Sequence, residues 1–74
     1  MNYYEKAKAI ISELRKKVDG DIRWDLEIMH IGGGEAAYFD VYIGFKQYEI
    51  PSATFEFQDV NEIVEDVVKR WKKN

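Results

Sequence analysis

The spacing of apolar residues changes twice along the chain, and this change is the strongest constraint on its fold. Apolar residues recur every three or four positions as far as Val18, alternate with polar residues from Ile22, and return to the wider spacing at Val60. A spacing near 3.6 is typical of an amphipathic helix, and alternation is typical of a strand with one buried face. The sequence therefore predicts the order helix, strands, helix.

The N-terminal segment predicts a helix that ends near Gly20. Its apolar stripe consists of Tyr3, Tyr4, Ala7, Ile10, Ile11, Leu14 and Val18. Asn2 can cap the first turn, and Glu5 stands three residues later, where a capping box has its acid. Asp19 and Gly20 then form a stop signal, because glycine adopts a left-handed backbone conformation without steric cost.

The C-terminal segment predicts a second helix. Its apolar stripe consists of Val60, Ile63, Val64, Val67, Val68 and Trp71. Asp59 and Glu62 repeat the spacing of a capping box. The first half of the segment is acidic and its end is basic, which complements a helix dipole. Because Trp71 lies on the apolar stripe, core packing explains it better than stacking on a nucleic-acid base.

Three strands are expected between the helices. The face toward the helices should carry Ile22, Trp24, Leu26, Ile28, His30, Ala37, Phe39, Val41, Ile43, Tyr48 and Ile50, with Phe45 as a further candidate. The third strand is expected over residues 47–52, with Pro51 on an edge strand or at a strand end because proline has no amide hydrogen. Residues 53–58 have two interpretations. They either extend the third strand or form a loop that places Phe55 and Phe57 under the last helix.

These elements predict one α+β domain over residues 1–74. Short connections favour a two-layer fold: a three-stranded antiparallel meander, with the second strand in the middle, carries the N- and C-terminal helices on one face (αβββα). The chain has no cysteine, so packing rather than disulfides must stabilise it. Trp24 and Trp71 are expected to be buried in the core, and Tyr42 is expected to be exposed.

The glycine run at residues 32–34 raises the question of a phosphate-binding loop. Such loops lead from a strand into a helix, whose first amide groups meet the anion. Here a second strand follows instead, so the run predicts a hairpin turn. A second turn is expected at residues 44–46.

Residues with catalytic or metal-binding chemistry are sparse. His30 is the only histidine, Ser12 and Ser52 are the only serines, and cysteine is absent. No spacing suggests a nucleophile with its base and orienting group. One imidazole among scattered carboxylates matches no zinc pattern. We therefore expect no enzyme activity, no catalytic residue, no metal and no cofactor.

Charge and hydropathy narrow the choice of partner. The formal net charge of −3 disfavours general binding to free nucleic acid or to an anionic membrane. No apolar run approaches the ~20 residues of a membrane span. The N-terminus lacks the apolar core of a signal peptide. The expected location is the cytoplasm.

The sheet face opposite the helices carries the main candidate site. Alternation places Asp25, Glu27, Tyr38, Asp40, Tyr42 and Glu49 on this face, with Arg23 as the one cation to offset them. Acids at positions i and i+2 of a strand lie about 6.7 Å apart, a spacing comparable with that of successive phosphates along a nucleic-acid strand. Such a face could bind a basic groove on another protein. The alternatives are an ordinary solvated face, whose acids keep the sheet soluble, and an interface at the glycine turn.

The element order, with the runs VYI, YEI and NEIVE at residues 41–43, 48–50 and 61–65, resembles that of small acidic anti-CRISPR proteins encoded by phages. Those proteins imitate DNA and occupy the PAM-reading site of an RNA-guided DNA nuclease. The resemblance implies an inhibitor from a phage or mobile element, acting in a bacterial cell on a basic partner protein. In that family, acids near the second hairpin contribute to binding, whereas residues 44–47 here hold a lysine and no acid.

A self-associating structural or regulatory protein is the second functional class. The first strand lies at an edge of the expected meander, where its unpaired backbone groups could bind another copy and form a homodimer. A molecular size that depends on concentration would favour this class.

Overall fold

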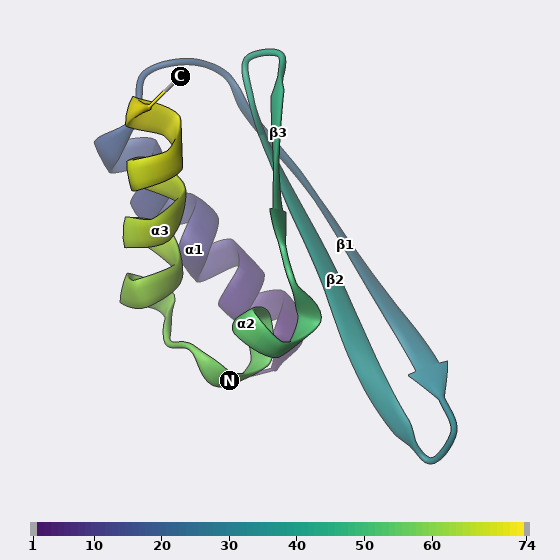
Figure 1. Ribbon diagram of the computed structural model, residues 1–74. Coiled ribbons are helices and arrows are strands. Elements are labelled where there is room, and N and C mark those ends of the chain that lie inside the picture. Colours follow the sequence, from purple (N-terminus) through teal and green to yellow (C-terminus); the bar gives the residue numbers. More distant parts are fainter. Residues whose placement is uncertain (1, 74) are drawn as a thin grey trace.

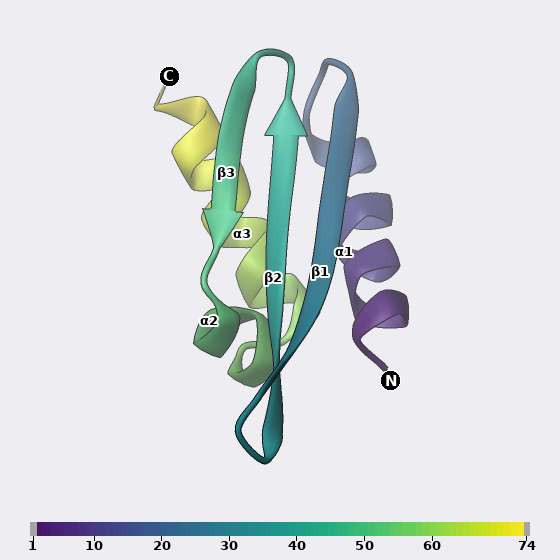
Figure 2. The same ribbon diagram turned by 90° about the vertical axis from the view of Figure 1, so that its right-hand side faces the viewer.

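The computed structural model describes residues 2–73. Along them lie α1 (Tyr3–Lys17), β1 (Ile22–Ile31), β2 (Gly34–Ile43), β3 (Lys46–Ile50), α2 (Ser52–Phe57) and α3 (Val60–Lys72). The strands form one antiparallel sheet in the order β1-β2-β3, and the helices lie on one face of it (Figures 1 and 2). The predicted two-layer αβββα architecture, with the second strand in the middle, is confirmed.

Both long helices begin at the predicted capping boxes. The Asn2 side chain accepts a hydrogen bond from the Glu5 amide at 2.8 Å, and the Asp59 side chain accepts one from the Glu62 amide at 2.9 Å. Each glutamate side chain in turn accepts a hydrogen bond from the amide of its cap residue. α1 and α3 run side by side in the same direction (Figure 1).

Two-residue turns set the register of the sheet. Gly32 and Gly33 connect β1 to β2, and Gly44 and Phe45 connect β2 to β3. The first residue of each turn is a glycine with φ of 61°, which suits the type II′ turn of a hairpin. The predicted hairpin at the glycine run is confirmed, and Gly34 already belongs to β2.

The core lies between the sheet and the helices. Its largest fully buried side chains are Phe39, Phe55, Ile10, Ile11, Leu14, Ile63, Val41, Val64 and Val67. The ring centroid of Phe39 on β2 lies 5.1 Å from that of Phe55 on α2 and 6.1 Å from that of Trp24 on β1. Burial of each large side chain contributes roughly 1.5–3 kcal/mol before the entropy cost of ordering.

The connection after β3 is a short helix, which neither interpretation of residues 53–58 predicted. α2 follows Pro51, whose φ of −57° suits a helix start. Phe55 is fully buried, as the loop interpretation expected, but Phe57 is 82% exposed. Residues two positions apart on a helix point in nearly opposite directions, so one of the pair must face solvent. The third strand ends at Ile50, earlier than expected.

Other expectations about burial and boundaries need correction. Trp24 and Trp71 are half-buried and pack against the margin of the core. Trp24 lies on an edge strand, which limits how much of its ring the helices can cover. Tyr42 is half-buried rather than exposed, because the Arg23 guanidinium lies 5.5 Å from its ring centroid. α1 ends before the expected stop at Gly20.

The outer half of the β1–β2 hairpin projects beyond the helices (Figure 1). We call residues 28–36 the hairpin arm. β3 pairs with residues 39–43 of β2, so over the arm β2 pairs with β1 alone. Ile28 lies on the predicted core face but is 41% exposed, while Met29 and Ile31 are 42% and 56% exposed. The arm therefore leaves large apolar side chains in solvent.

Candidate functional site

The register of the sheet brings three predicted site residues into one row. Asp25 of β1 lies opposite Asp40 of β2, and Asp40 lies opposite Glu49 of β3. Opposed residues in antiparallel strands have Cα atoms about 4.5–5.5 Å apart and side chains on the same face. The three acidic residues therefore form one row across the full width of the sheet, with their side chains on the same face. We call these residues the acidic row.

Mixed pairs flank the acidic row on the same face. Glu27 lies opposite Tyr38 on one side of the row. On the other side, Arg23 lies opposite Tyr42, which lies opposite Gln47. We call the six predicted contact residues the acidic face: Asp25, Glu27, Tyr38, Asp40, Tyr42 and Glu49. The register places all six on one side of the sheet.

Neighbouring polar groups offset part of this negative charge, and the Arg70 guanidinium of α3 donates a hydrogen bond to the Glu49 carbonyl at 3.2 Å. Gln47 Nε2 donates a hydrogen bond to Asp40 Oδ1 at 3.3 Å. The cation of this face, Arg23, donates to the Gly44 carbonyl at 3.4 Å and lies over the Tyr42 ring. Like charges directly opposite each other destabilise an antiparallel pair. The acidic row therefore lowers the stability of the sheet that carries it.

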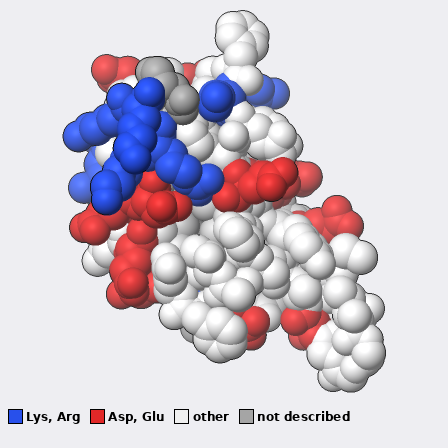
Figure 3. Space-filling model, in the orientation of Figure 1, with Lys and Arg blue, Asp and Glu red and all other residues white. Residues whose placement is uncertain are grey.

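The acidic face is turned away from the helical layer. Within residues 2–73, all helices pack on the other side of the sheet (Figures 1 and 2). Asp25, Glu27, Tyr38 and Glu49 are exposed, and Asp40 is half-buried. In the orientation of Figure 1, the largest visible group of lysines and arginines lies at the end where α1 and α3 finish, while acids spread over the body of the molecule (Figure 3).

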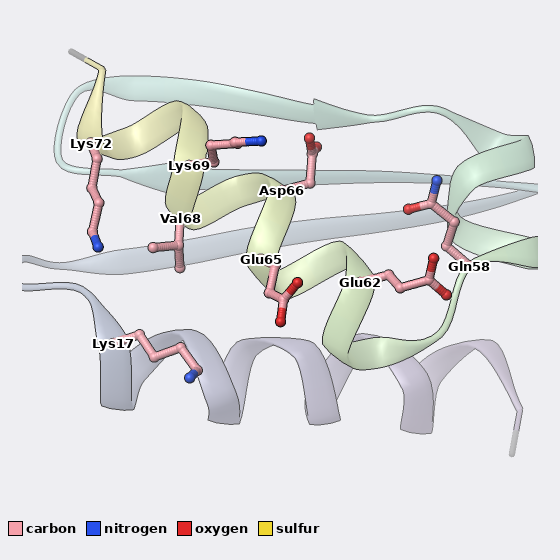
Figure 4. A pocket seen from close by; sticks show the side chains of 8 residues that line it. All are labelled: Lys17, Gln58, Glu62, Glu65, Asp66, Val68, Lys69 and Lys72. Carbon is pink, nitrogen blue, oxygen red and sulfur yellow. The ribbon is translucent and has the colours of Figure 1, made fainter.

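A groove of about 520 Å³ runs along α3 beside the end of α1 (Figure 4). Its lining consists of Lys17, Gln58, Glu62, Glu65, Asp66, Val68, Lys69 and Lys72. Glu62 belongs to the capping box of α3, and Asp66 pairs with Arg70 at 3.0 Å. Carboxylates and ammonium groups are mixed in this lining, so the groove presents no single charge to a ligand.

A second groove, of about 470 Å³, separates the start of α1 from the hairpin arm. Its lining consists of Asn2, Tyr3, Tyr4, Ile28 and Glu35. Burial, followed by the negative charges of Glu56 and Glu35 and a hydrogen bond to Glu56, raises the pKa of Tyr3. The Tyr3 ring lies 5.9 Å from the ring of Phe55. These contacts give Tyr3 a structural role between α1 and α2.

Groups with catalytic or metal-binding chemistry stay dispersed in the part of the chain that the structure describes. No three histidine, aspartate or glutamate side chains there lie close enough together to hold a metal ion. His30 is exposed near the end of β1, opposite Glu35. Over the same residues, no helix combines the length and the apolar character needed to cross a membrane.

Sequence reasoning found the acids of the site but missed their alignment. Alternation assigns a residue to a face, whereas turn length decides which residues oppose each other. Three-residue turns were expected, and the chain uses two residues in each. The sequence did contain a signal for the shorter turns, because a Gly-X pair between alternating runs favours a two-residue turn. Gln47, which hydrogen-bonds to Asp40, was missed for the same reason.

Comparison with protein-family models, with curated proteins and with solved structures finds no match to this chain. The resemblance to DNA-mimicking inhibitors therefore stays a hypothesis.

Proposed function

We propose that this protein is a non-enzymatic binding module whose acidic face docks onto a basic surface of another protein. The observation that carries the proposal is the acidic row, in which three carboxylates oppose one another in register. Such a row costs stability in the free protein. A cationic partner would offset that cost on binding, because its charges would lie between the carboxylates.

The chemistry of the face supports a protein partner with arginines or lysines. Arginine binds carboxylates through two parallel hydrogen bonds, and a row of carboxylates offers several such positions. Tyr38 and Tyr42 lie beside the row and supply rigid, amphipathic contact area. The phosphates of nucleic acids and of anionic membranes carry the same charge as the row. Neither is proposed as a partner of this face.

The resemblance to phage inhibitors supports a narrower form of the proposal. Carboxylates at roughly 5–7 Å spacing could occupy a groove built for nucleic-acid phosphates. DNA binding to such a groove depends on lysine and arginine contacts to phosphate. An RNA-guided DNA nuclease is therefore the first partner class to test, and inhibition would result from competition with DNA.

A defined cationic probe tests the acidic face. The test variant changes the acidic row to Asn, Asn and Gln, which removes its charge and keeps side-chain size. The control variant, Asp19→Asn with Asp21→Asn and Glu65→Gln, removes the same charge from exposed acids elsewhere. In a titration with an arginine-rich peptide, we expect roughly tenfold weaker binding for the test variant and a much smaller loss for the control. Equal losses would contradict the proposal, because net charge alone would then drive binding.

DNA cleavage by a panel of purified RNA-guided nucleases tests the narrower form. We expect the parent protein to slow cleavage by at least one nuclease, with excess DNA relieving the inhibition. The variant with the neutralised row should not inhibit. Unchanged DNA cleavage by every nuclease in the panel would contradict the nuclease proposal. The peptide titration separately tests the broader proposal that the acidic face binds a basic protein surface.

A further inference from the structure

The free edge of β1 carries an inference that does not depend on the acidic face. β1 lies at one edge of the sheet and has ten residues. The Asp21 carbonyl accepts a hydrogen bond from the Gly44 amide at 3.0 Å, and bonding to a neighbouring strand alternates along an antiparallel pair. The backbone amide and carbonyl groups of the odd-numbered residues of β1 therefore form hydrogen bonds with β2. The backbone groups of Ile22, Trp24, Leu26, Ile28 and His30 point to the open edge.

The outer half of this edge lacks the features that normally protect an edge strand. Proteins protect such edges with charged residues, proline or a bulge. The last four residues of β1 read IMHI, with no acid, lysine, arginine or proline, and their pairing with β2 is regular. Ile28, Met29 and Ile31 are all exposed there. Apolar exposure and unpaired backbone groups thus coincide on one short segment.

Among the described residues, no strand pairs with the outer edge of β1. Figure 2 shows α1 extending past the β1 edge on the helical side of the sheet. A strand placed beside β1 would therefore lie over α1 as well as against β1. The Tyr4 side chain in the first turn of α1 is exposed, and its ring centroid lies 5.9 Å from that of Trp24 on β1. An added strand would therefore lie next to this pair of aromatic rings.

We propose that a second copy of this chain binds to this open edge, with β1 paired antiparallel to β1 of the second copy. Charge and strand length together select the register: among registers that set no carboxylate opposite another, centring on Ile28 pairs the longest stretch of β1, residues 25–31. Centring the pair on Ile28 sets Met29 opposite Glu27 of the second copy and Ile31 opposite Asp25 of the second copy. Centring it on Asp25 or Glu27 would set that carboxylate opposite the same carboxylate of the second copy, which is unfavourable. Centring it on Leu26 would set Asp25 against Glu27.

This arrangement fixes the geometry of the dimer. Two identical antiparallel strands in one sheet are related by a two-fold axis perpendicular to the sheet. Both helical layers then lie on one side and both acidic faces on the other. The contact uses the backbone edge and the arm residues, with Ile31 beside Asp25 of the second copy, and it covers neither acidic face. Loss of dimerisation and loss of binding to a cationic peptide are therefore separable results.

Opposite charges at Met29 test the proposed register. Sedimentation equilibrium of the full chain should show a mass that rises with concentration toward that of a dimer. Met29→Glu should raise the dimer dissociation constant roughly tenfold, because it opposes Glu27 of the second copy, and Met29→Lys should lower it. Phe45→Glu and Phe45→Lys make the same charge changes at the fully exposed turn between β2 and β3. They should have much smaller effects.

A single cysteine provides a second measurement. The chain has no cysteine, so Ile28→Cys can form a disulfide only between two copies. Residues in a hydrogen-bonded antiparallel pair have Cα atoms about 5.5 Å apart, within the range of a disulfide. We expect Ile28→Cys to form a covalent dimer on mild oxidation much faster than Phe45→Cys. Equal rates, or a monomer at the highest soluble concentration, would overturn the proposal.

Discussion

Asp25 and Asp40 lie directly opposite each other on adjacent strands, with Glu49 next to Asp40 on the third strand. A sheet selected for stability alone would place opposite charges or hydrogen-bonding pairs at these positions. Residues that break a local rule without a local gain tend to belong to functional sites. The proposed role of the acidic face rests on this relationship.

Removing the central charge of the acidic row should stabilise the protein. Asp40→Asn keeps the side-chain size and an oxygen that can accept the Gln47 hydrogen bond, but relieves repulsion from both neighbouring carboxylates. We expect the free energy of unfolding to rise by about 0.2–1 kcal/mol for each relieved pair at low salt. Urea denaturation measures this rise, and added salt should reduce it.

Glu27→Gln is the matched control for that measurement, because Glu27 lies on the same face but opposite Tyr38. Its effect on unfolding should be smaller than that of Asp40→Asn. A loss of stability in Asp40→Asn at low salt would show that the row is not under electrostatic strain.

Two phenylalanines of α2 should differ sharply in their effect on stability. Phe55 is fully buried against Phe39, whereas Phe57 is mostly exposed. Phe55→Ala should cost about 3–5 kcal/mol because it leaves a cavity in the core. Phe57→Ala should change the free energy of unfolding by less than about 0.5 kcal/mol. Similar effects in thermal or chemical denaturation would mean that α2 does not pack as described.

The capping box of α3 should act as a unit. Asp59→Ala removes the side chain that accepts the Glu62 amide hydrogen bond, and should cost about 1 kcal/mol. Glu62→Ala removes the reciprocal bond to the Asp59 amide. We expect the double variant to lose less stability than the sum of the single losses, since the two bonds depend on each other. Additive losses in a double-mutant cycle would argue against the reciprocal arrangement.

Alkaline pH should weaken the packing around Tyr3. Burial and the charges of Glu56 and Glu35 raise the pKa of Tyr3 above its ordinary value. The folded state therefore holds this proton more tightly than the unfolded state. The resulting stability is complete below the unfolded pKa of about 10 and is lost as pH rises through the folded pKa.

Tyr3→Phe isolates this effect from the other tyrosines. The variant should lose less stability than the parent between mildly and strongly alkaline pH, because it has no phenol to ionise at that position. Tyrosinate absorbance should show one fewer group titrating at the high-pH end. An identical alkaline decline of stability in both proteins would contradict the assignment.

The sequence predicted the layers of this fold because apolar spacing and caps are local signals. Asn2 and Asp59 start their helices as expected, and alternation assigned Phe39 and Val41 to the core face. The helix after Pro51 was missed, because six residues with alternating apolar character also fit a strand. Its helical form depends on the burial of Phe55, which is a tertiary contact.

The extent and the pairing of the helices and strands were harder to predict than their type. Trp24 and Ile28 were correctly placed on the inner face, but the sequence does not say where the helices stop covering it. Likewise, alternation in the sequence predicted that Asp25 and Asp40 share one face, but it did not predict that they lie opposite each other. That pairing depends on the length of the Gly32–Gly33 turn. A one-residue change in turn length would give a different row.

Chemical-shift mapping with a short arginine-rich peptide tests the central claim most directly. Amide and side-chain resonances of the acidic row and of Tyr38 should shift together as peptide is added, and salt should reverse the shifts. The carboxylates Glu62, Glu65 and Asp66 on α3 serve as an internal control, because they also line a groove. If the largest shifts occur on α3 and the acidic row stays unperturbed, the acidic face is not the binding surface.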